Sequence, residues 1–145
     1  MNSRWLRVII DIDQDRHARP LTEPRTLSTR VAGCCRDHCL FVVGALRERG
    51  VAARNRVGFA SYLLPGFHLD HVVVEYWNGT RWVRTDPERP HGSADVESTD
   101  MPRGPSAPFQ TAAEVWQRYR CGDLDASRYC IHPGSEPSGV ALIGT

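Results

Sequence analysis

A tight turn at Asn78-Gly79 constrains the fold of this chain more than any other short stretch of its sequence. Asn-Gly is a preferred pair for a type I′ turn, in which both central residues adopt positive φ. The flanking segments, residues 71–77 and 81–85, are rich in β-branched and aromatic side chains, which is typical of strands. The sequence therefore predicts an antiparallel hairpin over residues 71–85.

A two-residue turn at this position fixes which residues of the hairpin lie opposite each other. It places Glu75 opposite Trp82, and it places His71 opposite Asp86. Directly opposite side chains share one face of the sheet, with Cβ atoms roughly 4.5–5.5 Å apart. At that separation a carboxylate can accept a hydrogen bond from an imidazole, fix its tautomer and stabilise its charged form. We therefore expect a hydrogen-bonded pair between His71 and Asp86.

An apolar helix is predicted upstream of the hairpin, over about residues 34–49. Apolar side chains recur at helical spacing from Cys35 to Leu46, and Gly50 stands where a left-handed C-cap residue belongs. The unpaired N–H groups at a helix N-terminus favour a thiolate over a thiol. Because Cys35 begins the apolar stripe and Cys34 points about 100° away from it, Cys35 is the candidate nucleophile.

Three residues together predict nucleophilic catalysis. Cys35 is the expected nucleophile, His71 its base and later its acid, and Asp86 the group that orients His71. The backbone N–H of Cys35, at the start of the helix, is the expected donor to the oxyanion.

The remaining segments complete one predicted domain over residues 1–145, with a core over about residues 20–131. The capping-box pattern from Thr111 to Glu114 predicts a second helix that ends near Cys121. Residues 87–108 hold five prolines, three serines and two glycines, which predicts a long surface loop, either a lid or poorly ordered. The Gly-, Pro- and Ser-rich residues 132–145 are expected to be a poorly ordered tail. Two further segments carry weaker signals: residues 5–12 suit a short helix or a strand, and residues 51–59 suit a strand.

Composition excludes several classes of protein. Eighteen basic residues, all arginine, against seventeen acidic ones give a formal charge of +1, so no overall field attracts nucleic acid or an anionic membrane. The apolar run at residues 40–46 is far shorter than the ~20 residues that span a bilayer, and residues 8–10 are too short for the core of a signal peptide. Five cysteines, three of them within six residues, make a poor disulfide framework. We expect reduced thiols and a cytoplasmic location.

The order of these motifs resembles the transglutaminase-like superfamily. Residues 33–37, read Gly-Cys-Cys-Arg-Asp, match the family pattern G-x-C-R-D ahead of an apolar helix, and residues 47–54 are similar to its RxxGVPAR segment. His71 and Asp86 then follow in the family's order of Cys, His and Asp. Residues 109–131 are similar to the segment after the aspartate in a bacterial subgroup, so the resemblance covers roughly residues 20–131.

The resemblance implies an α+β, papain-like core in which the nucleophile helix packs on an antiparallel sheet that carries the His and the Asp. It also implies cysteine-dependent acyl transfer at an amide or peptide carbonyl through a thioester, ending in hydrolysis or in transfer to an amine. The expected substrate is a peptide or an amide-bearing small molecule. No cofactor, no nucleic acid and no membrane is expected as a partner, and the oligomeric state stays open.

Two other functions stay open. The family usually continues beyond residue 131 with an aromatic-rich segment that this chain lacks, so a catalytically inactive binding module is one alternative. A zinc-binding protein is the other, although no C-x-x-C pair is present; its candidate ligands are Cys34, Cys35, His38, Cys39, His68 and His71. Glu75, Trp77 and Trp82 are expected to pack on the sheet, and most arginines to be solvated.

Overall fold

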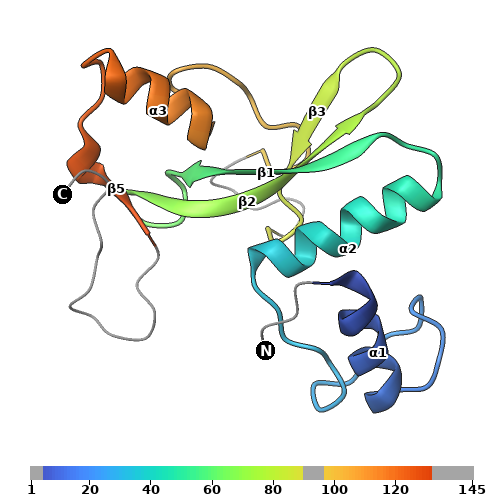
Figure 1. The fold of residues 1–145 in the computed structure, drawn as a ribbon. Coiled ribbons are helices and arrows are strands. Elements are labelled where there is room, and N and C mark those ends of the chain that lie inside the picture. Colours follow the sequence, from blue (N-terminus) through green and yellow to red (C-terminus); the bar gives the residue numbers. More distant parts are fainter. Residues whose placement is uncertain (1–4, 90–96, 132–145) are drawn as a thin grey trace.

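The structure, a computed structural model, describes residues 5–89 and 97–131. Its elements, in chain order, are α1 (Leu6–Arg16), α2 (Cys35–Glu48), β1 (Ala53–Ala60), β2 (His68–Trp77), β3 (Trp82–Thr85), β4 (Phe109–Thr111), α3 (Ala112–Arg120), a 3-10 helix η1 (Ala126–Arg128) and β5 (Tyr129–Cys130). A curled sheet runs through the middle of the molecule, with α2 along one side of it and α1 beyond α2 (Figure 1). The predicted α+β fold, with an apolar helix packed on an antiparallel sheet, is confirmed.

The sheet has the strand order β3-β2-β1-β4, and each neighbouring pair in this series is antiparallel. The short β5 pairs with the beginning of β2 in parallel. Strands β1 and β2 form the long central ribbon, in which Gly58 lies opposite His71. The candidate histidine therefore stands on one of the two central strands of the described part of the sheet.

Side chains of β2 are buried on both faces of the sheet. Val74 packs with Cys39 and Val43 of α2, whereas Val73 packs on the other face with Phe109 and Met101. This burial on two sides explains why residues 72–74 are three consecutive valines rather than an alternating pattern.

The N-terminal segment forms a helix, where the sequence was compatible with either a helix or a strand. Helix α1 packs on α2 at Gly44, where an added Cβ would overlap the Leu6 side chain. Asp13 of α1 accepts two hydrogen bonds from Arg25, from Nε at 3.1 Å and from Nη2 at 2.6 Å. This bidentate pair ties the loop between the two helices to α1.

The predicted register of the hairpin is wrong by two residues. Trp77 pairs with Trp82, and Glu75 pairs with Arg84, because residues 78–81 form a four-residue loop. The side-chain oxygen of Asn78 accepts the backbone N–H groups of residues 80 and 81, at 3.0 and 2.9 Å. Only Gly79 of the loop has positive φ, so the turn is held by the asparagine side chain and is not of type I′. Since side chains alternate with a period of two, this shift leaves every residue on its predicted face.

The second half of the predicted surface loop is instead packed on the sheet. The Asp86 N–H donates to the Ser98 carbonyl and the Met101 N–H to the Arg84 carbonyl, both at 2.8 Å, so residues 98–101 run beside β3. Ser98, Met101 and Ala107 are buried. Without this segment β3 would present an unpaired edge. Residues 90–96 of the predicted loop, which was open to interpretation as a lid, and the predicted tail 132–145 lie outside the described residues.

The predicted second helix is confirmed as α3. The Thr111 hydroxyl accepts the Glu114 N–H at 3.2 Å, and the Glu114 carboxylate accepts the Thr111 N–H at 2.6 Å. This reciprocal pair is the capping box that the sequence predicted.

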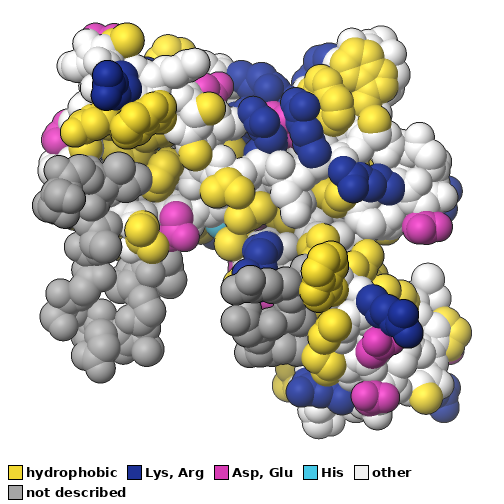
Figure 2. Space-filling view, viewed as in Figure 1, with side chains coloured by type: hydrophobic (Ala, Val, Ile, Leu, Met, Phe, Trp, Pro, Cys, Tyr) yellow, Lys and Arg dark blue, Asp and Glu magenta, His cyan; other side chains and the backbone are white. Residues whose placement is uncertain are grey.

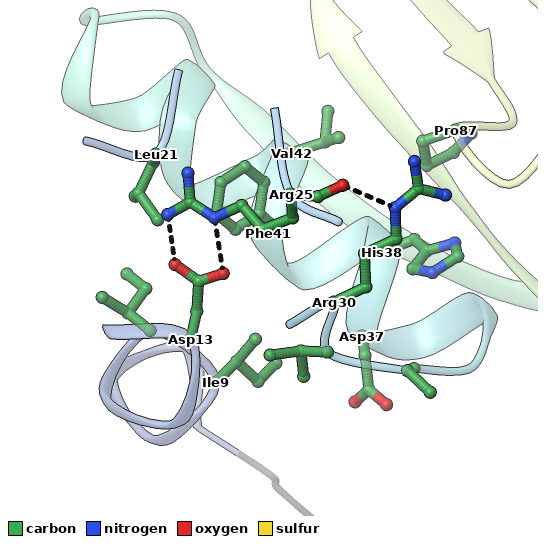
Figure 3. A pocket seen from close by; sticks show the side chains of 14 residues that line it. Ile9, Asp13, Leu21, Arg25, Arg30, Asp37, His38, Phe41, Val42 and Pro87 are labelled. Atoms are coloured by element: carbon green, nitrogen blue, oxygen red, sulfur yellow. Dashed lines mark hydrogen bonds and ion pairs between the residues drawn. The ribbon is translucent and has the colours of Figure 1, made fainter. Parts of the chain in front are cut away.

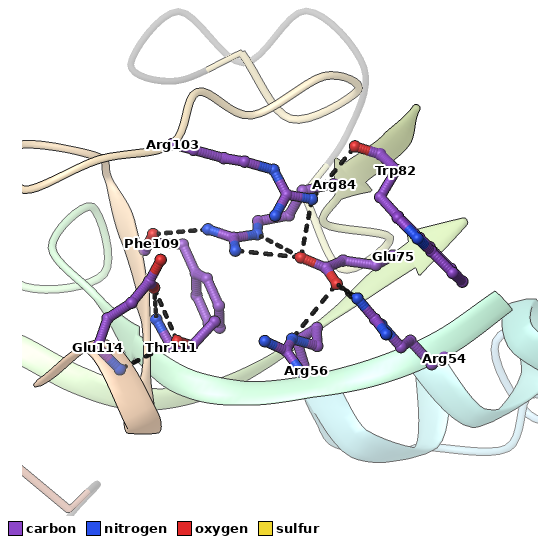
Figure 4. Close-up of polar contacts among 9 residues, drawn as sticks. All are labelled: Arg54, Arg56, Glu75, Trp82, Arg84, Arg103, Phe109, Thr111 and Glu114. Carbon is purple, nitrogen blue, oxygen red and sulfur yellow. Dashed lines mark hydrogen bonds and ion pairs between the residues drawn. The ribbon is translucent and has the colours of Figure 1, made fainter. Parts of the chain in front are cut away.

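A buried carboxylate on β2 is surrounded by arginines, where simple sheet packing and solvated arginines were expected (Figure 4). Glu75 is fully buried and accepts hydrogen bonds from the equally buried Arg84 at 3.1 and 3.3 Å. Three half-exposed arginines complete the cluster: Arg54, Arg56 and Arg103. Burial acts to raise the pKa of Glu75, but the hydrogen bonds from Arg54 and Arg84 and the other positive charges hold it below its usual value. At the surface, arginines gather between α3 and the β2–β3 hairpin (Figure 2).

Replacing Glu75 with leucine should destabilise the fold by about 3–5 kcal/mol, because Arg84 would keep a buried charge without its counterion. The double variant Glu75→Leu/Arg84→Met should lose much less, since it removes both buried charges. Urea unfolding of the three proteins measures the difference. A double variant as unstable as Glu75→Leu alone would contradict the ion-pair explanation.

Replacing Gly58 with alanine should also destabilise the sheet, by about 1–3 kcal/mol. A Cβ at this position would overlap the Gln110 carbonyl oxygen and lie 2.7 Å from Phe109 Cζ, so β4 could not approach β1 as closely. Val57→Thr, at the neighbouring exposed position, is the matched control and should change stability by no more than about 0.5 kcal/mol. Thermal or urea unfolding of Gly58→Ala and Val57→Thr tests this prediction. If the two variants are equally stable, β4 does not need to approach β1 this closely at Gly58.

Candidate active site

The first turn of α2 presents two cysteines, and an aspartate holds that turn in place. Cys34 is the N-cap residue, and its backbone N–H donates to the Asp37 carboxylate at 3.1 Å. Burial acts to raise the pKa of Asp37, but the hydrogen bonds from Cys34 and the charge of Arg36 hold it below its usual value. Cys34 is exposed and Cys35 half-buried, so the two neighbouring thiols lie in different environments.

His71 and Asp86 meet just beyond the end of β3. The His71 Nε2 atom lies 2.8 Å from Asp86 Oδ2, and both side chains are almost fully buried. The same carboxylate oxygen accepts the Tyr62 hydroxyl at 2.6 Å, and the other oxygen accepts the Glu88 N–H at 3.0 Å. The pair predicted from the hairpin is therefore present, although the two residues are not directly opposite each other.

These contacts favour the charged form of both partners. Burial acts to lower the pKa of His71, but the hydrogen bonds to Asp86 and Cys35 outweigh it and raise the pKa to about 9. Burial acts to raise the pKa of Asp86, yet the hydrogen bonds from His71 and Tyr62 hold it below its usual value. Burial, with the bond to Asp86, raises the pKa of Tyr62, which keeps its hydroxyl as a donor. At neutral pH the centre holds an imidazolium next to a carboxylate.

The other ring nitrogen of His71 faces a thiol and a second carboxylate. The ligand atoms of Cys35, His71 and Glu88 all lie within 4.8 Å of one another. His71 Nδ1 is 3.9 Å from Glu88 Oε2. Since Asp86 occupies Nε2, Nδ1 is the nitrogen available to exchange a proton with Cys35.

The arrangement can generate and stabilise a nucleophile. A thiol at the start of a helix loses its proton readily when an imidazolium stands beside it. A histidine held on its far side by a buried carboxylate can take and return that proton without changing orientation. The geometry therefore suits attack by sulfur on an electrophilic carbon.

Among the described residues, the group of three possible metal ligands that lie close together includes Cys35 and His71 from the candidates in the sequence, with Glu88 as the third. Cys39 is buried in the core, where its thiol donates to the Val72 carbonyl at 3.1 Å and burial raises its pKa. The His68 ring stacks on Tyr129, with centroids 4.4 Å apart. The multi-cysteine zinc set considered from the sequence is therefore not assembled within the described residues.

Sequence reasoning missed three residues of this centre. Tyr62 lies between the segments predicted as strands, outside every motif of the sequence, and Glu88 lies in the predicted surface loop. Asp37 was part of the family motif, but its hydrogen bond to the Cys34 N–H was not anticipated. An acidic residue at the N3 position of a helix is a capping signal that could have revealed it. No local pattern points to Tyr62 or Glu88, because their partners are distant in the chain.

A pocket of about 480 Å³ opens beside the centre, between α1, the loop after it and α2 (Figure 3). Ile9, Leu21, Phe41 and Val42 give it apolar walls, and the Asp13–Arg25 pair crosses one side of it. Neither Cys35 nor His71 lines the pocket. Its lining nevertheless includes Gly33 and Asp37, which are two residues from Cys35 in the chain, and Pro87, which follows Asp86.

Comparison with known proteins identifies one family. Residues 3–87 match the family model of the transglutaminase-like superfamily. This range contains Cys35, His71 and Asp86. No curated protein and no solved structure matches the chain. In residues 5–89 and 97–131, no helix has both the length and the apolar character that crossing a membrane requires.

Replacing Asp86 with asparagine should lower the pKa of His71 well below about 9, because burial of the ring remains while the carboxylate charge and its hydrogen bond are removed. NMR titration of the His71 ring protons measures this pKa. Asp70→Asn, next to His71 on the opposite face of β2, is the control and should leave it near 9. A wild-type pKa near 6.5 would contradict the charged pair.

The same pair should make stability depend on pH. The pKa of His71 is higher in the folded state than the unperturbed 6.5, so its contribution is fully present below pH 6.5 and is lost as the pH rises through about 9. The stability advantage of wild type over Asp86→Asn should therefore fall between pH 6.5 and about 9.5. Urea unfolding across this range tests the prediction; a constant difference would refute it.

Proposed function

The chain belongs to the transglutaminase-like superfamily, and on that premise we propose that it catalyses cysteine-dependent acyl transfer at an amide or peptide carbonyl. Cys35 is the nucleophile, His71 the acid and base, and Asp86 the residue that orients and charges His71. One observation carries the proposal: a half-buried thiol at the start of α2 lies beside a histidine whose far nitrogen is bonded to a buried carboxylate.

Acylation begins from a Cys35 thiolate and a His71 imidazolium. The sulfur forms a bond to the carbonyl carbon, and the developing oxyanion accepts a hydrogen bond from the Cys35 N–H, which as a first-turn group has no partner within the helix. His71 Nδ1 gives its proton to the departing amine as the C–N bond breaks. The products are a thioester on Cys35, a free amine and a neutral imidazole.

Deacylation reverses these roles. Neutral His71 takes a proton from water or from an acceptor amine, which attacks the thioester carbon. The C–S bond breaks, an acid or a new amide leaves, and the thiolate–imidazolium pair is restored. Asp86 stays ionised throughout, because its contacts with His71 and Tyr62 stabilise its charge. No step requires a cofactor.

The pocket beside the centre supports an acyl donor with an apolar group. Its walls are mostly aliphatic and aromatic, and it ends at residues adjacent to Cys34 and Asp86 in the chain. Pockets of this size and lining bury apolar parts of small ligands. We therefore propose a peptide or amide-bearing small molecule that places an apolar substituent between α1 and α2.

All five cysteines are free thiols. The proposed chemistry needs Cys35 reduced, and exposed Cys34 next to it would form mixed disulfides under oxidising conditions. We accordingly propose that the protein works in a reducing compartment such as the cytoplasm.

A non-catalytic binding module is the competing function, and thiol reactivity separates the two. Mass spectrometry can follow iodoacetamide alkylation at each cysteine near pH 6.5, where an ordinary thiol is mostly protonated. Cys35 should react up to about 100-fold faster in wild type than in His71→Gln, because an ordinary thiol of pKa about 8.5 is only about 1% thiolate at pH 6.5 and the imidazolium favours the reactive thiolate. Exposed Cys34 is the internal control and should react at the same rate in both proteins. Equal slow labelling of Cys34 and Cys35 would favour the binding module.

Trapping of the acyl-enzyme tests the reaction itself. Incubation with an activated aryl ester of an apolar carboxylic acid should add one acyl group to wild type and to Cys34→Ser. Neither Cys35→Ala nor His71→Gln should carry it, and hydroxylamine should remove it, as expected for a thioester. Acylation that persists in Cys35→Ala would contradict the proposal.

A further inference from the structure

Glu88 takes no part in the proposed reaction, yet its carboxylate faces the same ring nitrogen of His71 that serves Cys35. Its Oε2 lies 3.9 Å from His71 Nδ1, and the Cys35 sulfur, one ring nitrogen of His71 and one carboxylate oxygen of Glu88 lie within 4.8 Å of one another. The Glu88 side chain is partly exposed, so water and solutes reach this group from outside.

The three ligand atoms are a sulfur, an imidazole nitrogen and a carboxylate oxygen. This is a donor set that zinc accepts, at about 2.3 Å for sulfur and about 2.0–2.2 Å for nitrogen and oxygen. Around a tetrahedral ion, two such ligands lie about 3.3–3.7 Å from each other. The 3.9 Å separation of His71 Nδ1 and Glu88 Oε2 is close to that spacing. The three ligand atoms lie within 4.8 Å of one another, so small rotations of the Cys35 and Glu88 side chains would bring them to that spacing.

The surroundings of His71 also match those of a metal ligand. Histidines that bind zinc usually donate their other ring N–H to a carboxylate, which fixes the tautomer and raises the basicity of the ligating nitrogen. His71 Nε2 already lies 2.8 Å from the buried Asp86 carboxylate, leaving Nδ1 toward Cys35 and Glu88. Asp86 is held in turn by the Tyr62 hydroxyl at 2.6 Å.

We propose that Cys35, His71 and Glu88 bind a single Zn²⁺ ion reversibly, and that the bound ion blocks the nucleophile. Binding uses the thiolate and displaces the proton of His71 Nδ1 to solvent, with a water molecule as the fourth ligand. Binding itself does not depend on catalysis. Inhibition by the ion rests on the proposed function, because the bound zinc would occupy both the nucleophile Cys35 and its acid–base partner His71.

Cobalt(II) provides a direct readout, because it occupies zinc sites and a thiolate ligand gives it an intense near-ultraviolet charge-transfer band. Titrated with Co²⁺ under anaerobic conditions, wild type and Cys34→Ser should develop this band at one equivalent and lose it on addition of Zn²⁺. Cys35→Ala should not develop it. Glu88→Gln should bind at least about tenfold more weakly, since even indirect supports of a metal ligand contribute about 10–100-fold to affinity.

Glu48→Gln is the matched control for Glu88→Gln. It makes the same change at an exposed position at the far end of α2, about 20 Å from its first turn. It should bind Co²⁺ as tightly as wild type. Equal affinity in Glu88→Gln and Glu48→Gln would overturn the site, as would a charge-transfer band that depends on Cys34 instead of Cys35.

A second measurement separates this proposal from the proposed function. Iodoacetamide labelling of Cys35 should slow when Zn²⁺ is added to wild type, and should do so at a concentration at least about tenfold higher in Glu88→Gln. If metal-free Cys35 proves unreactive while the cobalt band forms, the catalytic proposal fails and the metal site stands. If Cys35 is reactive but zinc neither binds nor protects it, the metal site fails alone.

Discussion

The buried hydrogen bond between His71 and Asp86 is the interaction on which the rest of the candidate centre depends. It links β2 to the residue that follows β3, at 2.8 Å and almost out of contact with water. A charged imidazole could not remain there alone, because burial acts to lower its pKa. The Asp86 carboxylate, itself held by the Tyr62 hydroxyl and the Glu88 N–H, compensates that charge. Orientation and protonation of His71 thus follow from one contact.

A second buried pair on the same face of β2 holds this contact in register. Glu75 lies opposite Arg84 in the β2–β3 ladder, four residues along the strand from His71. In the register expected from a two-residue turn, Arg84 would lie opposite Val73, and its buried charge would lose its counterion. Since breaking a buried ion pair costs about 3–5 kcal/mol, that register is strongly disfavoured. The arginine cluster and the candidate centre are therefore coupled through the alignment of two strands.

A turn after β3 places two carboxylates on different sides of the histidine ring. Asp86 occupies Nε2 from the buried side, and Glu88 approaches Nδ1 from the exposed side. Helix α2 brings Cys35 to the same group, where its sulfur lies within 4.8 Å of a His71 ring nitrogen and a Glu88 carboxylate oxygen. His71 Nδ1 can therefore do one of two things. It can exchange a proton with the Cys35 sulfur, or, as we propose, it can bind a metal ion together with Cys35 and Glu88.

Local signals in the sequence determined the elements and the candidate residues of this protein. The apolar stripe predicted α2, the Thr111–Glu114 pattern predicted the start of α3, and β-branched runs about Asn78-Gly79 predicted the hairpin, because each depends on neighbours within a few residues. Tertiary structure decided the register, the burial of Arg84 and the positions of Tyr62 and Glu88. The register depends on the Asn78 side chain, which accepts backbone N–H groups of the loop in place of a type I′ turn. The positions of Tyr62 and Glu88 depend on their hydrogen bonds to Asp86, which lies in a separate segment from Tyr62. No periodicity encodes such contacts, since their free energy arises only once the strands and α2 have packed together.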